Sequence, residues 1–317
     1  MSAGPDAMLK APAVSDAPAG AAVRTRPYYW SVRREIWEHR AIYLGPLAVA
    51  AFAVLVHVLS IIAGGGAGHT VHEVHADDPT QPYTAVYDSL TGIIVTTGLL
   101  VGVLYSLGAL YGERRDRSIL FWKSLPVSDV TAVLAKAAIP LIVLPLVILA
   151  VVIAASLTTA ALQIIVWSMK GFEPGALWAQ LDLPFVWLSL LYGLPFMVLW
   201  YAPVYAWLLL VSAWAPRWPF LWGAAPFVLM LIVEHGPLMG TRVHWLVERY
   251  LGGGVLQPYV RGDGYWTRGL TELDWIESLA ELEPARLYTL PVLWIGVLLA
   301  ALFLFLAARV RRTRAPI

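Results

Sequence analysis

The sequence predicts an all-α integral membrane protein with six transmembrane helices. We also expect an N-terminal amphipathic helix, one short cytoplasmic helix and short external re-entrant or interfacial helices. Two observations lead to this prediction. The 317-residue chain is 59% hydrophobic and 14% charged, with a mean hydropathy of +0.68, which is typical of a surface that faces lipid. Its apolar residues also form long runs, and about 20 such residues in a helix cross the roughly 30 Å hydrocarbon core of a bilayer.

The composition also excludes several classes of function. The chain has no cysteine, which excludes disulfides, thiolate metal sites and thiol catalysis. Its net charge is +1, without a Lys/Arg-rich tail, so nothing predicts a nucleic-acid partner. It contains no G-x-x-x-x-G-K-[ST], G-x-S-x-G or H-E-x-x-H motif. We therefore predict that this chain is not an enzyme and has neither catalytic nor cofactor-binding residues.

The N-terminal part divides into two segments. Residues 1–28 are rich in Ala, Pro and Gly without periodicity, and we expect a disordered cytoplasmic terminus. Residues 29–40 predict an amphipathic interfacial helix, whose main residues are Trp30, Arg33, Arg34, Ile36 and Trp37. The apolar stripe at helical spacing consists of Tyr29, Val32 and Ile36 with the two tryptophans. The charged residues lie largely on the opposite face: Arg33, Arg34, Glu35 and Glu38.

Six apolar runs form one predicted transmembrane domain over residues 41–311. The spans are about 43–63, 89–111, 137–161, 184–211, 219–233 and 288–308. The fifth run is short for a bilayer. Five prolines inside the spans predict kinks that neighbouring helices must compensate; they are Pro140, Pro145, Pro195, Pro203 and Pro226.

Charge distribution supports an even number of spans. With six spans and a cytoplasmic N-terminus, 16 of the 22 Lys and Arg residues lie on the inner side, and 14 of the 21 Asp and Glu residues lie outside. Positive residues beside spans mark the cytoplasmic side. Five spans would place the C-terminal arginines outside, so we predict that both termini are cytoplasmic.

Three external loops are predicted, about 64–88, 162–183 and 234–287. The last mixes aromatic and charged residues, which favours short helices at the outer leaflet. The first carries His69, His72 and His75 before two aspartates. Such a set can bind zinc or copper, but a polar loop without metal is the favoured interpretation. We predict no metal site.

Residues 112–129, "GERRDRSILFWKSLPVSD", place charged and aromatic residues between the second and third spans. We expect a short helix that ends before Pro126, followed by a helix capped by Ser128. One interpretation is a positive-inside loop lying on lipid headgroups. The other is a docking site for a cytoplasmic partner, formed by Arg114, Arg115, Asp116, Arg117, Phe121, Trp122 and Lys123.

The segment "LYGERRDRSILFWKSLPVSDVTAVLAK" (110–136) closely resembles the corresponding segment of ABC-2 type permeases, the membrane subunits of bacterial ATP-binding-cassette exporters. The stretch "YYWSVRREIWEHRAIYLGPL" (28–47) resembles the start of that family, and the six-span layout is similar. In the family, the segment matched by 110–136 carries a coupling helix that inserts into the ATPase. The resemblance covers most of residues 28–312, but it is specific only at 110–136.

The resemblance implies a permease subunit that exports a hydrophobic or amphipathic substrate, driven by ATP and Mg²⁺ on a separate ATPase. It also implies two ATPase copies, a second permease that is identical or a close paralogue, surrounding lipid, and the bacterial inner membrane. Two alternatives remain open: a membrane anchor or sensor that docks a partner without transport, and an ion-coupled carrier. The carrier is disfavoured because His57 is the only ionisable Asp, Glu, Lys, Arg or His residue within the six runs.

Overall fold

The computed structural model describes residues 26–63, 81–124, 127–169, 183–235 and 291–313, together with Gly171 and Gly175. All regular elements within these residues are helices. The predictions for residues 1–25, for most of the three external loops and for the three loop histidines concern parts of the chain outside the described residues. The amphipathic helix begins at Pro27, slightly before its predicted start.

The described helices, in chain order, are α1 (Pro27–Glu38), α2 (Ala41–Ile62), α4 (Gln81–Arg115), α5 (Ile119–Ser124), α6 (Asp129–Ala138), the π-helical segment η1 (Ile139–Val143), α7 (Leu144–Met169), α9 (Leu183–Trp214), α10 (Pro219–His235) and α13 (Pro291–Thr313).

Five of these helical stretches are long and apolar enough to cross a bilayer: Ala41–Ile62, Ser89–Arg115, Asp129–Val166, Leu190–Trp214 and Leu293–Thr313. The chain is therefore an all-α, multi-pass membrane protein, as its composition predicts. α10 has 17 residues, or about 26 Å of helix, which is at the short limit for a span. Helix length thus supports five spans, and the sixth depends on α10.

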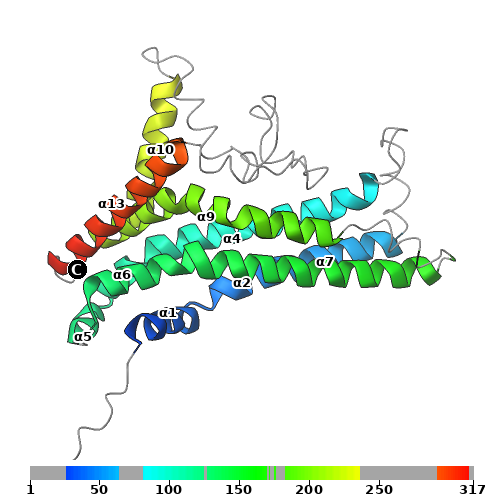
Figure 1. The fold of residues 1–317 in the computed structure, drawn as a ribbon, viewed down its shortest axis with the longest axis horizontal. Helices are drawn as coiled ribbons and strands as arrows, with labels where there is room; N and C mark the ends of the chain where they lie inside the picture. The colour runs from blue at the N-terminus through cyan, green and yellow to red at the C-terminus, as the bar shows by residue number, and fades with distance from the viewer. Residues whose placement is uncertain are drawn as a thin grey trace, which may run out of the picture.

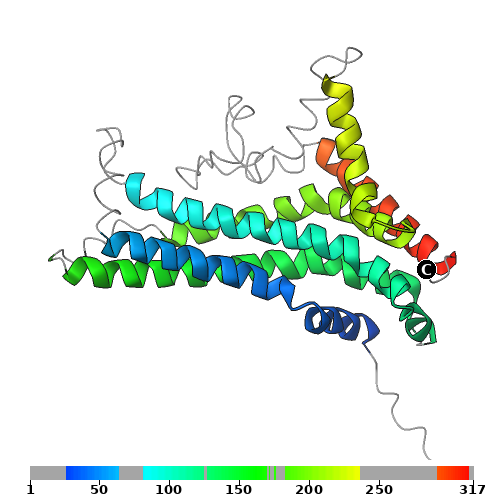
Figure 2. The ribbon, with the colours of Figure 1, turned by 180° about the vertical axis from the view of Figure 1, so that it is seen from behind.

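α2, α4, α7 and much of α9 lie side by side along one axis of the molecule, whereas α10 and α13 run at a steep angle to this axis (Figures 1 and 2). α1, α5 and the C-terminal end of α13 gather at one end of the bundle, which we call the α5 end. The C-terminal turns of α4 and α9 meet there too, because Arg114 of α4 hydrogen-bonds to the carbonyl oxygens of Ala213 and Ala215. Segments from the start, the middle and the end of the described chain thus converge at the α5 end.

The apolar core lies between α4, α7 and α9. Its largest fully buried side chains include Ile94, Ile148, Phe196 and Leu209. α9 is the most buried of the five spans and α2 the least, so α2 presents much of its apolar surface outward. This arrangement suits a bilayer, in which outward apolar residues meet acyl chains.

The third span is not a uniform α-helix. It starts at Ser128, whose hydroxyl oxygen accepts a hydrogen bond from the Thr131 amide at 3.1 Å, as the capping prediction requires. Between α6 and α7 the chain forms the π-helical segment η1, which contains Pro140. Proline removes a backbone donor and clashes with the preceding turn, and a wider π turn relieves that clash. The sequence predicts a kink at Pro140, and the structure has the π-helical segment at this position, whereas α9 continues as a helix through Pro195 and Pro203.

Glycine allows α4 and α9 to approach closely. A Cβ atom added to Gly102 would lie 2.8 Å from the hydroxyl oxygen and 2.9 Å from ring carbons of Tyr205. Gly108, on the same helix, has nothing within 4 Å of such an atom. The two glycines therefore differ in packing although both are helical.

We expect Gly102→Ala to lower the free energy of unfolding by about 1–3 kcal/mol, because the Tyr205 ring must be displaced. Gly108→Ala is the matched control, and it should be neutral or stabilise by roughly 0.5–1 kcal/mol through helix propensity. Denaturant unfolding of both variants in detergent micelles measures the difference. Equal effects of the two substitutions would show that the close contact of α4 with α9 does not limit stability.

Candidate functional site

The short helix predicted between the second and third spans is present as α5. Phe121 and Leu120 are 60% and 59% exposed, whereas Ile119 is buried and anchors the helix. Arg115, Asp116 and Arg117 are exposed in the preceding turn. The side chains of Trp122 and Lys123 lie outside the described part of the chain. α5 therefore presents an aromatic side chain and nearby charges on the outer surface of the α5 end.

The turn before α5 contains an unusual backbone conformation. Arg117 has a φ of 57°, in the left-handed region that glycine adopts readily and other residues seldom adopt. A left-handed residue after a helix is a common way to end it, usually with glycine. Here an arginine occupies this position and carries its charge to the surface beside α5.

Arg114 is not on this surface, although the sequence groups it with the docking residues. It is 3% exposed, and its Nη1 donates hydrogen bonds to the carbonyl oxygens of Ala213 at 2.7 Å and Ala215 at 3.2 Å. The last carbonyl groups of a helix lack internal partners and carry a partial negative charge. Arg114 satisfies those of α9, so we remove it from the docking set.

Ser212 strengthens the same junction. Its hydroxyl oxygen accepts hydrogen bonds from the amides of Leu110 and Tyr111 at 3.0 and 2.9 Å, and its hydroxyl donates to the Leu107 carbonyl oxygen at 2.8 Å. Ser212 is fully buried. A buried hydroxyl without hydrogen-bond partners costs free energy. These bonds therefore fix the position of α9 along the axis of α4.

A network of buried ion pairs lies beneath α5. The Nζ atom of Lys136 in α6 is 2.9 Å from an Oε1 atom of Glu35 in α1 and 3.1 Å from Oε1 of Glu113 in α4. The side chains of Lys136, Glu35 and Glu113 are 3%, 1% and 9% exposed. One ammonium group thus joins two carboxylates that belong to different helices, away from water.

Two arginines complete the network. Arg311 of α13 lies 3.1 Å from Glu113 Oε2 and 2.5 Å from Asp129 Oδ1 at the start of α6. Arg34 of α1 lies 2.6 Å from Glu35 and 3.4 Å from Glu113. Three acidic and three basic groups therefore balance, and they connect α1, α4, α6 and α13. We call these six residues the ion network.

Glu35 is the most deeply buried acid of the ion network. Burial raises the pKa of the Glu35 carboxyl group, but the charges and hydrogen bonds of Lys136 and Arg34 outweigh burial and hold this pKa at about 2. The Tyr105 hydroxyl also donates a hydrogen bond to Glu35 Oε2 at 2.8 Å. Glu35 is therefore ionised throughout the physiological pH range.

Sequence patterns place Glu35 on the wrong face of α1. The prediction sets it opposite the apolar stripe, whereas the structure buries it together with Val32 and Ile36, which pack against the core. Trp30 and Trp37 instead point outward, at 55% and 62% exposed. A charged residue faces the bundle because Lys136 and Arg34 neutralise it there.

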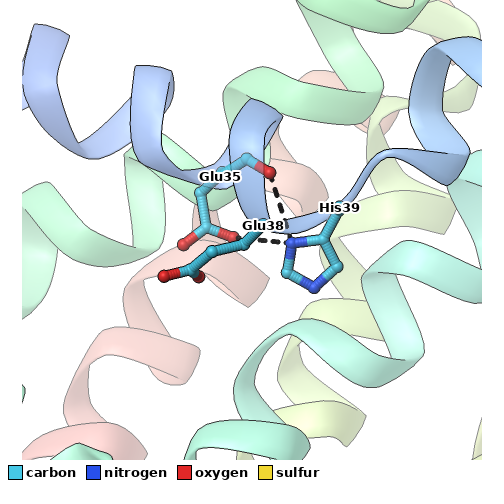
Figure 3. A group of neighbouring side chains, drawn as sticks. All are labelled: Glu35, Glu38 and His39. Carbon is cyan, nitrogen blue, oxygen red and sulfur yellow. Dashed lines mark hydrogen bonds and ion pairs between the residues drawn. The ribbon is translucent and has the colours of Figure 1, made fainter.

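Glu35, Glu38 and His39 form a cluster at the end of α1 whose ligand atoms lie within 4.8 Å of one another (Figure 3). His39 Nδ1 is 3.3 Å from the Glu35 carbonyl oxygen and 3.7 Å from Glu35 Oε2. Such a group can ligate a metal in principle. Here the Glu35 carboxylate is already bound by Lys136, Arg34 and Tyr105, so we assign Glu35 to the ion network and propose no metal at this cluster.

Comparison with protein-family models, with curated proteins and with solved structures gives no match for this chain.

We expect Lys136→Met to lower the free energy of unfolding by about 3–5 kcal/mol, because it leaves Glu35 and Glu113 buried without their shared cation. Adding Glu35→Gln to this variant should restore part of the loss, since the buried charge that Lys136 neutralised is then removed too. Denaturant unfolding in detergent gives these values.

Arg115→Met is the matched control, because Arg115 is exposed and its ion pair among the described residues is with its exposed neighbour Asp116. Unfolding of this variant should be indistinguishable from that of the wild type. A Lys136→Met protein as stable as the Arg115→Met protein would contradict the ion network.

Proposed function

We propose that this chain is the membrane subunit of an ATP-binding-cassette exporter of the ABC-2 type, and that it moves a hydrophobic or amphipathic substrate outward. The chain itself is not an enzyme; ATP and Mg²⁺ bind to two copies of a separate cytoplasmic ATPase. Its membrane partner is a second copy or a close paralogue, in the bacterial inner membrane. The resemblance of residues 110–136 supplies this family.

The observation that carries the proposal is the position of α5 above the ion network. Phe121 and Leu120 are exposed on α5, while Glu113, just before α5, is bound to Lys136 of α6 and Arg311 of α13. A force applied to α5 by a docked protein acts at once on the ends of α4 and α6, which flank it. Through the ion network the force also reaches α1 and α13, so α5 is well placed to transmit ATPase motion to the spans.

The direction of the helices supports six spans. The C-terminal end of α9 lies at the α5 end, where Arg114 binds it, and the C-terminal end of α13 lies there too, where Arg311 joins the network. If both helices span the membrane, α13 must begin on the opposite side. The chain between Trp214 and Pro291 must then cross the membrane an odd number of times. We assign a crossing to α10, the helix that the structure describes in this interval, which rises at a steep angle to α4 and α7 (Figure 1).

In this proposal, the α5 end is cytoplasmic and both termini lie on that side. The positively charged residues of the predicted inner segments favour this orientation. A protein that only anchors or senses a partner would share the docking surface but would show no transport.

We expect Phe121→Ala combined with Trp122→Ala to weaken binding of the ATPase at least about 30-fold, or to uncouple ATP hydrolysis from transport. A buried aromatic anchor at an interface typically contributes about 2 kcal/mol or more. Co-purification with the ATPase and transport into vesicles measure the two outcomes.

Phe52→Ala is the matched control, because Phe52 is an equally exposed phenylalanine, at 67%, on the lipid-facing helix α2. This variant should bind the ATPase and transport normally. If the α5 double variant folds, retains the ATPase and transports at the wild-type rate, α5 is a headgroup-facing loop and the proposal fails. Normal ATPase binding without any transport by the wild type would favour the anchor or sensor.

Cysteine labelling tests the topology, since the chain has no cysteine of its own. In intact cells, Arg314→Cys should resist a membrane-impermeant maleimide, whereas Gly253→Cys in the predicted external loop should react. After the cells are opened, Arg314→Cys should react as well. Labelling of Arg314→Cys in intact cells would place the C-terminus outside and exclude six spans with a cytoplasmic N-terminus.

A further inference from the structure

α1 carries an outward stripe formed by Trp30, Arg33 and Trp37. At about 100° per residue, Arg33 lies roughly 160° and Trp37 roughly 200° around the helix from Glu35. Trp30 and Trp37 are 55% and 62% exposed, while Glu35 is 1% exposed. The stripe therefore lies on the side of α1 opposite Glu35, which the ion network holds against the bundle. Rotation of α1 that would bury the stripe would break these ion pairs.

The three residues of the stripe are stacked against one another. The Arg33 guanidinium carbon lies 5.3 Å from the Trp30 ring centroid and 4.5 Å from the Trp37 ring centroid. Stacking of this kind orients a guanidinium group and leaves the N–H groups at its edge able to bind a planar or tetrahedral anion in a bidentate way.

Arg33 differs from its neighbour in its acidic partners. Arg34 pairs with Glu35, Glu38 and Glu113. Within residues 26–63 and the other described ranges, Arg33 has no ion pair, and its positive charge is held between two exposed indoles. The stripe is thus an oriented cation that no acidic group of the described residues neutralises, set in an aromatic surface.

The depth of α1 follows from α2. α2 has 22 residues, or about 33 Å of helix, which matches the hydrocarbon core of roughly 30 Å. Its first residue, Ala41, therefore lies near the edge of the hydrocarbon, and only His39 and Arg40 separate it from α1. Trp37 lies about one turn before this edge. A stripe at this depth that points away from the bundle meets lipid headgroups.

We propose that the stripe of Trp30, Arg33 and Trp37 is a binding site for the headgroup phosphate of an anionic phospholipid in the leaflet at the α5 end. The indole rings lie at the headgroup boundary, where tryptophan is favoured, and the guanidinium of Arg33 binds the phosphate oxygens. A bound headgroup supplies the counter-charge that the described residues lack. This site does not depend on the proposed transport function.

Native mass spectrometry of the full-length chain in detergent tests the site, with phosphatidylglycerol as the probe and phosphatidylcholine as the reference lipid. Wild-type protein should retain phosphatidylglycerol in preference to phosphatidylcholine. Arg33→Gln should weaken phosphatidylglycerol binding about fivefold, because one arginine near a bilayer surface contributes about that factor. Trp30→Leu with Trp37→Leu should weaken it as well, since the guanidinium loses its stacked orientation.

Arg309→Gln is the matched control. Arg309 is an exposed arginine on the last turns of α13 at the same end of the bundle, so its loss changes the net charge equally without touching the stripe. Equal weakening by Arg33→Gln and Arg309→Gln would show a general charge effect and overturn the site. Unchanged lipid retention in Arg33→Gln, with loss of a co-purified ATPase, would assign the stripe to a protein partner and overturn it too.

A structural defect is excluded by unfolding. Because Arg33 is not part of the ion network, Arg33→Gln should unfold at the same denaturant concentration as the wild type. If this variant is instead destabilised, Arg33→Lys provides the decision: it keeps the charge but loses the bidentate, stacked geometry, and the proposal requires it to bind phosphatidylglycerol more weakly than wild type.

Discussion

Lys136 places its ammonium group between Glu35 and Glu113, and the arrangement of the α5 end depends on this contact. A charge taken out of water loses several kcal/mol of hydration free energy, which is recovered only with close partners and additional hydrogen bonds. Lys136 has two carboxylates within about 3 Å, and Arg311 and Arg34 balance the charges that remain. Each charged side chain of the ion network would be destabilising in this buried position if its partners were removed.

This dependence gives the network a role that apolar packing does not fill. In a membrane, contacts between apolar helices compete with equally apolar lipid, so apolar burial alone specifies their positions weakly. Buried ion pairs seldom increase stability over well-packed apolar residues, but they tolerate few alternative arrangements. We infer that the network sets the position of α1 against α6 and of α13 against α4. The helices that lie beneath the short helix α5 are thus held in fixed positions.

Much of this architecture could be predicted from the sequence, because apolar run length and capping are local properties. Five of the spans, the short helix before Pro126 and the cap at Ser128 all follow from neighbouring residues. The ion network could not be predicted in this way, since Lys136 is 101 residues from Glu35. A polar residue on an amphipathic helix is expected to face water, and only the distant lysine reverses that expectation. The available signal was a lysine at the margin of an apolar run, with acids at the margins of two others.

In the docking segment, too, the sequence alone does not show which residues are exposed. Arg114 and Arg115 are adjacent and chemically identical, and composition gives no reason to separate them. About 100° of helical rotation turns Arg114 toward the carbonyl groups of Ala213 and Ala215, and leaves Arg115 beside Asp116 on the surface. Which arginine is structural depends on the end of α9, nearly one hundred residues later in the chain.

The π-helical segment at Pro140 has a consequence for side-chain phase along the third span. In an uninterrupted α-helix, Lys136 and Leu144 would point about 80° apart, since they are separated by eight positions at roughly 100° each. The wider turn accommodates about one extra residue, which brings the two directions to within about 20°. The charged side chain of Lys136 and the fully buried Leu144 and Ile148 thus share one face. The phase offset at η1 allows a single helix to point a cation at the carboxylates near one membrane surface and an unbroken apolar ridge at α4 and α9 in the membrane.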